Sequence, residues 1–190
     1  GPEHGDQACG DIGSGRMREP KDIVNDINSL EKRKKKLFKN KKVVITAGPT
    51  EEAIDPVRYI SNRSSGMMGC EIANAFHAQG AKVIIVKGPC KYSQNNEIES
   101  INVKTASEML MSVEKNITNC DIFVSVAAVS DFIAKKLSSK KIKSEDIPKL
   151  ELEKNIDIIK KISENYKVFS IGFAAETSEL KENALKKLKE

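Results

Sequence analysis

The stretch that decides the fold is KVVITAGPT, residues 42–50. Val43 to Ala47 form a short run of apolar and β-branched residues, which Gly48 and Pro49 end. A continuous run of this kind predicts a strand buried on both faces, as in a parallel sheet. Four more such runs follow, at 82–87, 101–105, 121–129 and 167–175.

Helical periodicity fills the intervals between these strands, at 67–80, 106–118 and 155–166, and again from 178 onward. Strands that alternate with helices predict an α/β fold, a doubly wound, mostly parallel, Rossmann-like sheet with helices on both faces. Ligands of such sheets bind beyond the carboxyl ends of the strands. The predicted ligand edge therefore comprises 48–50, 88–89, 127–132 and 173–177.

The composition indicates a folded, water-soluble chain. The 190 residues are 39% hydrophobic and 31% charged, and 32 basic against 27 acidic residues give a net charge of +5. No apolar run approaches the roughly 18 residues of a membrane span, and the first residues lack the pattern of a secretory signal. A cytoplasmic protein without a membrane partner is expected. Four scattered cysteines and two histidines do not predict a zinc site.

Two segments precede the main domain, which we place at 42–190. Residues 1–19 hold five glycines and are expected to form a loop that needs a partner. Residues 20–41 are expected to form a linker helix and a basic stretch. From Lys32 to Lys42, eight of eleven residues are Lys or Arg, which fits either a solvated helix end or a polyanion-binding patch.

The connection from Gly48 to Gly66 is long for a strand-to-helix loop, which makes it a functional candidate. It ends in SNRSSG, residues 61–66, just before a helix. Hydroxyls, an amide and a guanidinium at a helix N-terminus can hold an anion, although a merely capped helix start has the same pattern. The segment is neither G-x-G-x-x-G nor a Walker loop.

Two other strand ends carry functional candidates. Asp131 follows small residues at the end of the fourth strand, where it could bind a ligand donor or a metal, or could only cap a turn. The lysine-rich loop after it could clamp a triphosphate. Phe173, after the fifth strand, could be a core residue, which its propensity favours, or a stacking platform for a base.

Five segments in this order resemble phosphopantothenoylcysteine synthetase, which in most bacteria is the C-terminal half of the bifunctional coenzyme A biosynthesis protein. They are KKVVITAGPTEEAIDPVRYISNRSSGMMG (41–69), DIFVSVAAVSDF (121–132), KKIKS (140–144), EKNIDII (153–159) and GFAAET (172–177). The resemblance covers 42–190 and implies that the sheet is incomplete at its C-terminal end. It also implies a homodimer through this domain.

The resemblance implies a CTP-dependent ligation that joins 4′-phosphopantothenate to L-cysteine. CTP activates the carboxylate as an acyl-cytidylate and releases pyrophosphate, and cysteine then displaces CMP. Mg²⁺ and lysines would stabilise the crowded negative charge.

By the same resemblance, Lys141 would act in forming the acyl-cytidylate. Asn62 would contact the intermediate within a loop that continues through Arg63, Ser64, Ser65 and Gly66. Residues matching the nucleotide site are Ser125, Val126, Ala127, Asp131, Lys141, Asn155, Ile156, Asp157, Ile158, Phe173 and Lys187. The metal ligands are left open.

The first residues carry a second resemblance. PEHGDQACGDIGSGRM (2–17) is similar to the C-terminal motif of phosphopantothenoylcysteine decarboxylase, a flap that recognises the substrate. Cys9 matches the cysteine that protonates the enethiol intermediate. The FMN-binding body of that enzyme lies upstream of this motif, so decarboxylation and FMN binding are not expected of these residues alone. A higher oligomer through the decarboxylase domain is implied for the full protein.

Two other classes of function compete with the ligase. A nicotinamide-dependent reductase predicts a glycine-rich first turn and an acidic residue closing the second strand, and Gly48-Pro49-Thr50 and Lys87-Gly88 do not supply them. A non-enzymatic nucleic-acid module predicts aromatic platforms, yet aromatic residues are only 5% of the chain. We therefore expect no nucleic-acid partner.

Overall fold

A computed structural model describes residues 3–6, 10–33, 36–143, 145, 149–175, 179, 182 and 185. The chain divides into two compact units, Gly1–Leu37 and Phe38–Glu190. In the first unit, β1 (Glu3–Asp6) and β2 (Ile12–Arg16) form an antiparallel hairpin, and α1 (Pro20–Arg33) follows. A hairpin thus replaces part of the expected loop, because backbone pairing needs no large side chains.

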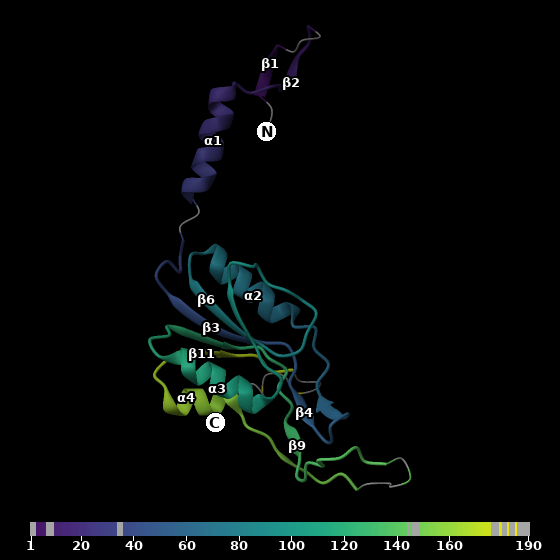
Figure 1. The fold of residues 1–190 in the computed structure, drawn as a ribbon. Coiled ribbons are helices and arrows are strands. Elements are labelled where there is room, and N and C mark those ends of the chain that lie inside the picture. Colours follow the sequence, from purple (N-terminus) through teal and green to yellow (C-terminus); the bar gives the residue numbers. More distant parts are fainter. Residues whose placement is uncertain are drawn as a thin grey trace. The chain divides into compact units, whose positions relative to one another are not determined.

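The second unit is built on a five-stranded sheet in which every neighbouring pair is parallel (Figure 1). Its strands are β3 (Lys42–Ala47), β6 (Lys82–Lys87), β7 (Glu99–Asn102), β8 (Ile122–Ser125) and β11 (Phe169–Gly172). Their order is β11-β8-β3-β6-β7, so the chain winds outward from β3 first in one direction and then in the other. The predicted doubly wound α/β fold is confirmed.

Helices cover both faces of the sheet (Figure 1). On one face, α2 (Met67–Ala78) packs through Cys70 and Ala73 against alternate β3 residues such as Val43 and Ile45. On the other face lie α3 (Ala106–Ile117) and α4 (Ile158–Asn165). The opposite face of β3 presents Val44 to them. The strands are thus apolar on both faces, which explains their continuous apolar runs.

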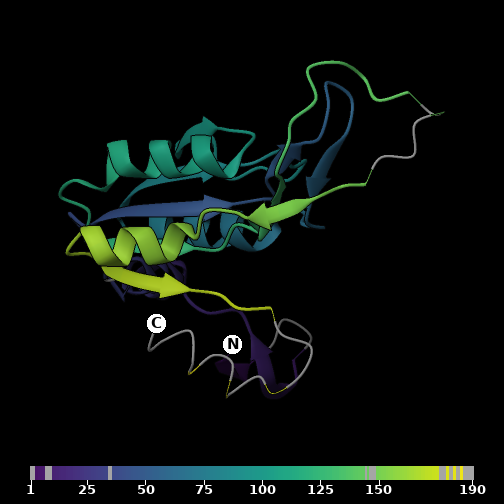
Figure 2. The same cartoon turned by 90° about the horizontal axis from the view of Figure 1, so that it is seen from below.

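Two small hairpins extend from the carboxyl edge of the sheet. β4 (Glu51–Ala53) pairs with β5 (Tyr59–Ser61), and β9 (Phe132–Ala134) pairs with β10 (Leu152–Lys154). We call residues 51–61 and 132–154 the arm. The amide of Ser138 donates to the carbonyl of Ile54 at 3.0 Å, which joins its two halves. In Figure 2 the blue arrow of β3 points toward the green loop of the arm.

Several predicted boundaries move for local reasons. The strand predicted at 121–129 ends at Ser125, because the next two amides donate to the Thr46 hydroxyl rather than to a neighbouring strand. The strand predicted at 101–105 becomes 99–102, because Thr105 caps α3 in a capping box with Glu108. The helix predicted at 155–166 begins at Ile158, because Asp157 is its N-cap. Most of the expected last helix lies outside the described residues.

The basic stretch is partly tied to the sheet. Lys41 Nζ lies 2.7 Å from Asp121 Oδ1, and the backbone amide of Lys42 donates to the other carboxylate oxygen at 2.8 Å. The hydrogen bond from Lys41 is the main reason why the pKa of Asp121 lies below its ordinary value. None of the helices in the described part of the chain combines the length and apolarity needed to cross a bilayer.

Candidate functional site at the carboxyl edge of the sheet

The site begins where β3 and β8 lie side by side and the chain leaves them in opposite directions. Such a switch point is where doubly wound sheets bind ligands. Here the amide of Ala128 donates to the carbonyl of Gly48 at 2.9 Å, and Pro49 forms a parallel bridge with Ala128. The two strand ends are thus held together beyond the sheet itself.

Two buried threonine hydroxyls shape the segment after β8. Thr46 Oγ1 accepts the amides of Val126 at 3.2 Å and Ala127 at 3.3 Å, and Thr50 Oγ1 accepts the amide of Ser130 at 3.1 Å. The backbone at 126–130 is therefore fixed by side chains from β3 and the residues after it. Thr50 lies in the predicted ligand edge, whereas Thr46 was not predicted as a site residue. A hydroxyl within an otherwise aliphatic strand was the signal that could have revealed Thr46.

The loop predicted to contact the intermediate reaches this segment. Asn62 Nδ2 donates to the carbonyl of Val129 at 2.9 Å. Gly66, with a φ of 75°, is the N-cap of α2. The hydroxyls of Ser64 and Ser65 accept the amides of Gly66 and Met67, each at 3.3 Å. Gly66 itself supplies no side-chain cap, and the amides of the helix start are partly satisfied by the serine hydroxyls of the preceding loop. Whether an anion also binds there stays a prediction.

The residues before α4 also bind this segment. Asn155 Nδ2 donates to the carbonyl of Ser130, and the Asn155 amide donates to the carbonyl of Asp131, both at 2.8 Å. The Asn155 side-chain oxygen accepts the amide of Ile156 at 2.8 Å. Asp157 accepts the amide of Lys160 as the cap of α4, and Ile158 is buried in the core. Asp131 itself is exposed.

Phe173 follows β11 at the same edge. Its amide donates to the carbonyl of Ser125 at 3.2 Å, but its ring is 52% exposed. The preference for a core position was wrong, because β11 ends at Gly172 and the ring lies beyond the sheet. An exposed ring beside Ser125 is available for stacking.

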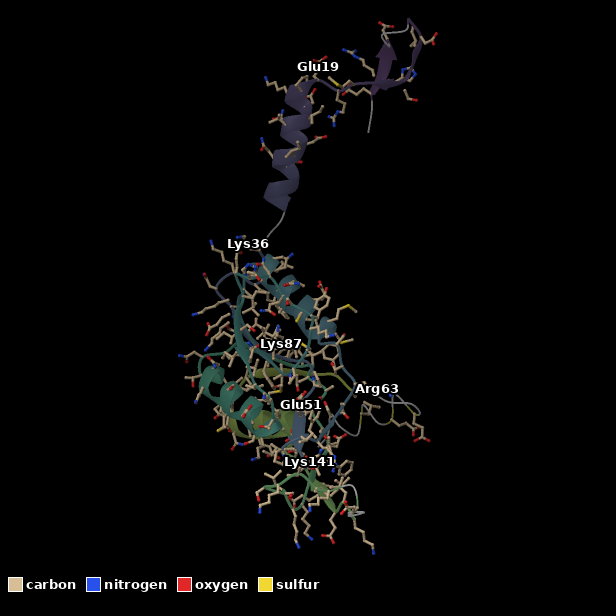
Figure 3. The ribbon with its side chains drawn as sticks, turned by 45° about the vertical axis from the view of Figure 1, so that its right-hand side comes forward. Glu19, Lys36, Glu51, Arg63, Lys87 and Lys141 are labelled. Atoms are coloured by element: carbon tan, nitrogen blue, oxygen red, sulfur yellow. The ribbon has the colours of Figure 1, made fainter. Side chains whose placement is uncertain are left out.

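Lys141 is exposed on the arm, on the loop that follows β9 (Figure 3). The next residue, Ile142, donates its amide to Asp55 Oδ2 at 3.2 Å, and its carbonyl accepts from Arg58 Nη2 at 3.1 Å. The contacts that fix this stretch are therefore made with the β4–β5 hairpin. The contacts of Asn62 and Asn155, in contrast, are made with the segment 129–131.

The fully buried Asp55 side chain makes one of the contacts that hold the Lys141 loop against the β4–β5 hairpin. It also accepts the amides of Val57 and Arg58, each at 2.8 Å, and lies 3.3 Å from Arg58 Nη1. Burial alone would raise the pKa of Asp55. The three backbone hydrogen bonds and the Arg58 charge outweigh that effect, so its pKa lies below the ordinary value. Asp55 was not among the predicted site residues.

The remaining predicted site residues differ in exposure, and two of them lie outside the described part of the chain. Arg63 is exposed on the loop before α2 (Figure 3), while Ser125, Val126 and Ala127 are half-buried at the switch point. Cys9 and Lys187 lie outside the described residues. Within the part of the chain that the structure describes, no group of three or more His, Cys, Asp or Glu side chains is placed to hold a metal ion.

Beside the switch point, a pocket of about 450 Å³ opens between the helix start and the segment after β6. Its lining residues are Ser64, Ser65, Pro89, Cys90, Lys91 and Tyr92. Close backbone packing lies behind it. A Cβ added to Gly88 would lie 1.7 Å from the Pro49 carbonyl oxygen, so only glycine fits there.

Comparisons with known proteins identify a matching family and similar relatives. The family described as DNA/pantothenate metabolism flavoprotein C-terminal domain matches residues 38–190. The chain is 42% identical over 193 residues to the coenzyme A biosynthesis bifunctional protein CoaBC of Vibrio parahaemolyticus, covering 99% of this chain and 48% of the relative. It is 43% identical over 191 residues to the CoaBC of Haemophilus influenzae, with the same two shares. The chain thus spans about half the length of the curated relatives it matches.

A solved structure, the C-terminal domain of coenzyme A biosynthesis bifunctional protein CoaBC, superposes with a TM-score of 0.70 at 39% identity. The match covers 80% of this chain and 73% of that one.

Proposed function

This chain belongs to the family of DNA/pantothenate metabolism flavoprotein C-terminal domains, and we propose that it acts in coenzyme A biosynthesis by ligating 4′-phosphopantothenate to L-cysteine with CTP. The observation that carries this proposal is a convergence of two side-chain amides. Asn62 and Asn155 donate to neighbouring carbonyls, those of Val129 and Ser130, in the segment after β8. A residue expected to contact the intermediate thereby lies beside residues expected to bind the nucleotide.

The backbone at the switch point supports a base that carries an exocyclic amine, as the proposed cytosine does. The amides of Val126, Ala127 and Ala128 already donate within the protein. A base recognised here would therefore present a donor of its own to a carbonyl, and cytosine does so through its exocyclic amine, whereas uracil has an acceptor at that position. The exposed ring of Phe173 would pack on the base.

The chemistry requires that two negative groups approach each other. In the first step, a carboxylate oxygen of 4′-phosphopantothenate attacks the α-phosphorus of CTP, and the bond to the leaving pyrophosphate breaks. Mg²⁺ would bind with the triphosphate and neutralise part of its charge. Lys141 is exposed on a loop that Asp55 and Arg58 hold, and its ammonium would stabilise the charge that develops.

In the second step, the amine of L-cysteine attacks the activated acyl carbon, the amide bond forms and CMP leaves. Asn62 would orient the acyl-cytidylate, because its amide group is already fixed on the Val129 carbonyl. The segment Arg63–Gly66 at the start of α2 would face a phosphate of the substrate or intermediate. The decarboxylation that the Cys9 motif implies would require the FMN-binding part of a longer protein.

We also propose that the domain works as a homodimer through the arm. Six large apolar side chains of the arm are substantially exposed: Val57, Tyr59, Phe132, Leu137, Leu150 and Leu152. They come from both halves of the arm. Exposed apolar side chains gathered on one structural feature are typical of an interaction surface.

The direct test is pyrophosphate release from CTP and 4′-phosphopantothenate with Mg²⁺ and without cysteine, which isolates the first step. We expect release with CTP and much less with UTP. Lys141→Ala should reduce the rate about 10²–10³-fold, the magnitude typical for the loss of one transition-state donor.

Lys140→Ala is the matched control, since it removes the same charge from the neighbouring position and should leave the rate close to that of the wild type. Equal rates for the two variants would contradict the role of Lys141. A wild-type chain that binds CTP yet releases no pyrophosphate would contradict the ligase proposal.

A further inference from the structure

Two cysteines that the proposed ligase does not use lie together beside the pocket. Cys70 belongs to the first turn of α2, and Cys90 follows β6. Their Sγ atoms lie 3.9 Å and 3.8 Å from one and the same acceptor, the backbone carbonyl oxygen of Tyr92. Both are free thiols.

The two thiols differ in access. Cys70 is fully buried, whereas Cys90 is partly exposed and lines the pocket of about 450 Å³. Cys90 also covers the start of α2, because a Cβ added to Gly66 would lie 2.4 Å from Cys90 Sγ. A thiol that is open to solvent beside a helix N-terminus is the one that a small reagent reaches first.

The surroundings of Cys70 protect its thiol from direct attack by a reagent in solution. Burial raises the pKa of Cys70, and the ammonium of Lys87 opposes part of this effect. Lys87 Nζ is held nearby, because it donates to the carbonyl of Tyr92 and to the side-chain oxygen of Gln94, both at 3.3 Å. Figure 3 labels Lys87 at the end of β6. A buried thiol with a neighbouring cation is protected from reagents yet can attack a bond formed next to it.

We propose that Cys70 and Cys90 form a redox-modifiable pair, which a small disulfide such as oxidised glutathione converts into an intramolecular disulfide. The Cys90 thiolate attacks one glutathione sulfur, so a mixed disulfide forms and one glutathione thiolate leaves. The Cys70 thiolate then attacks Cys90 Sγ, and the second glutathione thiolate leaves. Two electrons pass from the protein thiols to the reagent, and their two protons end on the two released glutathione molecules.

The fold allows the movement that bond formation requires. A disulfide brings its sulfur atoms to about 2.05 Å and its Cβ atoms to about 3.5–4.5 Å. Cys70 is fixed in α2, but Cys90 lies in the irregular stretch between β6 and β7. Cys90 would thus leave its place over Gly66 and move toward α2, which couples the pair to the start of that helix.

The test is incubation of the whole chain with oxidised glutathione, followed by blocking of free thiols and peptide mapping by mass spectrometry. In the wild type we expect a cross-linked pair of peptides containing Cys70 and Cys90, lighter by two hydrogens than the separate peptides. In Cys70→Ser and in Cys70→Ala, Cys90 should instead retain one glutathionyl group, because no second thiol displaces it. Two variants are used in case one of them folds poorly.

Cys120→Ser is the matched control. Cys120 is also buried, but its Sγ contacts the carbonyls of Lys42 and Ile122 at the other end of the sheet, so this variant should form the cross-link like the wild type. Equal glutathionylation of Cys90 in the wild type and in both Cys70 variants would overturn the proposal. Modification of Cys70 while Cys90 stays free would overturn it as well.

Discussion

At the scale of single residues, the Thr46 hydroxyl decides the backbone path at the switch point. It accepts two amides, those of Val126 and Ala127, within a strand that is otherwise aliphatic. Thr46→Val keeps the shape of the side chain but leaves both donors without this acceptor. We expect the free energy of unfolding to fall by about 1–3 kcal/mol, the usual cost of an unsatisfied buried group. Urea denaturation followed by circular dichroism measures this change, and CTP binding should weaken in parallel.

The control for this prediction keeps the hydroxyl. Thr46→Ser loses only a methyl group and should retain most of the stability and the affinity for CTP. If Thr46→Val were as stable as the wild type and bound CTP equally well, the two hydrogen bonds would not determine this backbone. A larger loss in Thr46→Ser than in Thr46→Val would point instead to packing of the methyl group, because Thr46→Val keeps that group and Thr46→Ser removes it.

At the scale of elements, the buried Asp55 carboxylate joins the two halves of the arm. Its pKa in the folded chain is depressed below the ordinary value of 3.8, so its contribution to stability is present at neutral pH. That contribution is lost as the pH falls through the depressed pKa, because the protonated carboxyl accepts the three amides less well and no longer attracts Arg58. The stability of the wild type should therefore decline in acid more steeply than that of Asp55→Asn.

Thermal unfolding across a pH series measures this difference, and an NMR titration of the Asp55 carboxyl carbon gives the pKa directly. Asp131→Asn is the matched control, because Asp131 is exposed and its substitution should leave the acid limb of the profile unchanged. A pKa for Asp55 at or above the ordinary aspartate value, or parallel profiles for wild type and Asp55→Asn, would contradict the anchoring role.

The same elements show what the sequence could reveal. The strand 82–87 was predicted with its observed bounds, because a run buried on both faces is apolar throughout. The arm was not predicted as hairpins, since each of its strands has three residues and its order depends on contacts such as Ser138 with Ile54, far apart in the chain. Propensity favoured a core position for Phe173 for a related reason: it describes the ring but does not tell where the strand ends.

At the scale of the whole molecule, the parallel sheet and the arm position different parts of the proposed site. The parallel sheet brings Ser125 and Phe173 to one edge, and any doubly wound sheet would do the same with its strand ends. The position of Lys141 depends on the arm, which is an addition to that sheet. The ligase proposal therefore rests on the arm as much as on the switch point, and the assembly proposed through the arm is the feature that most needs a test.

If the chain forms a homodimer through the arm, its mass in solution should depend on the exposed apolar side chains of the arm. We expect the wild-type chain to have the mass of a dimer in size-exclusion chromatography with light scattering. Leu137→Asp should shift it toward the monomer, because Leu137 is 67% exposed on the arm and a carboxylate there would be buried unpaired against a partner. Met111→Asp is the matched control: Met111 is 50% exposed, but it lies on α3, outside the arm, so this variant should remain dimeric.

A monomeric wild type, or a Leu137→Asp variant that stays dimeric, would show that the arm is not the contact between subunits. If Leu137→Asp became monomeric while pyrophosphate release continued at the wild-type rate, the dimer contact would not be required for the first chemical step, and Lys141 on the arm would act within its own chain.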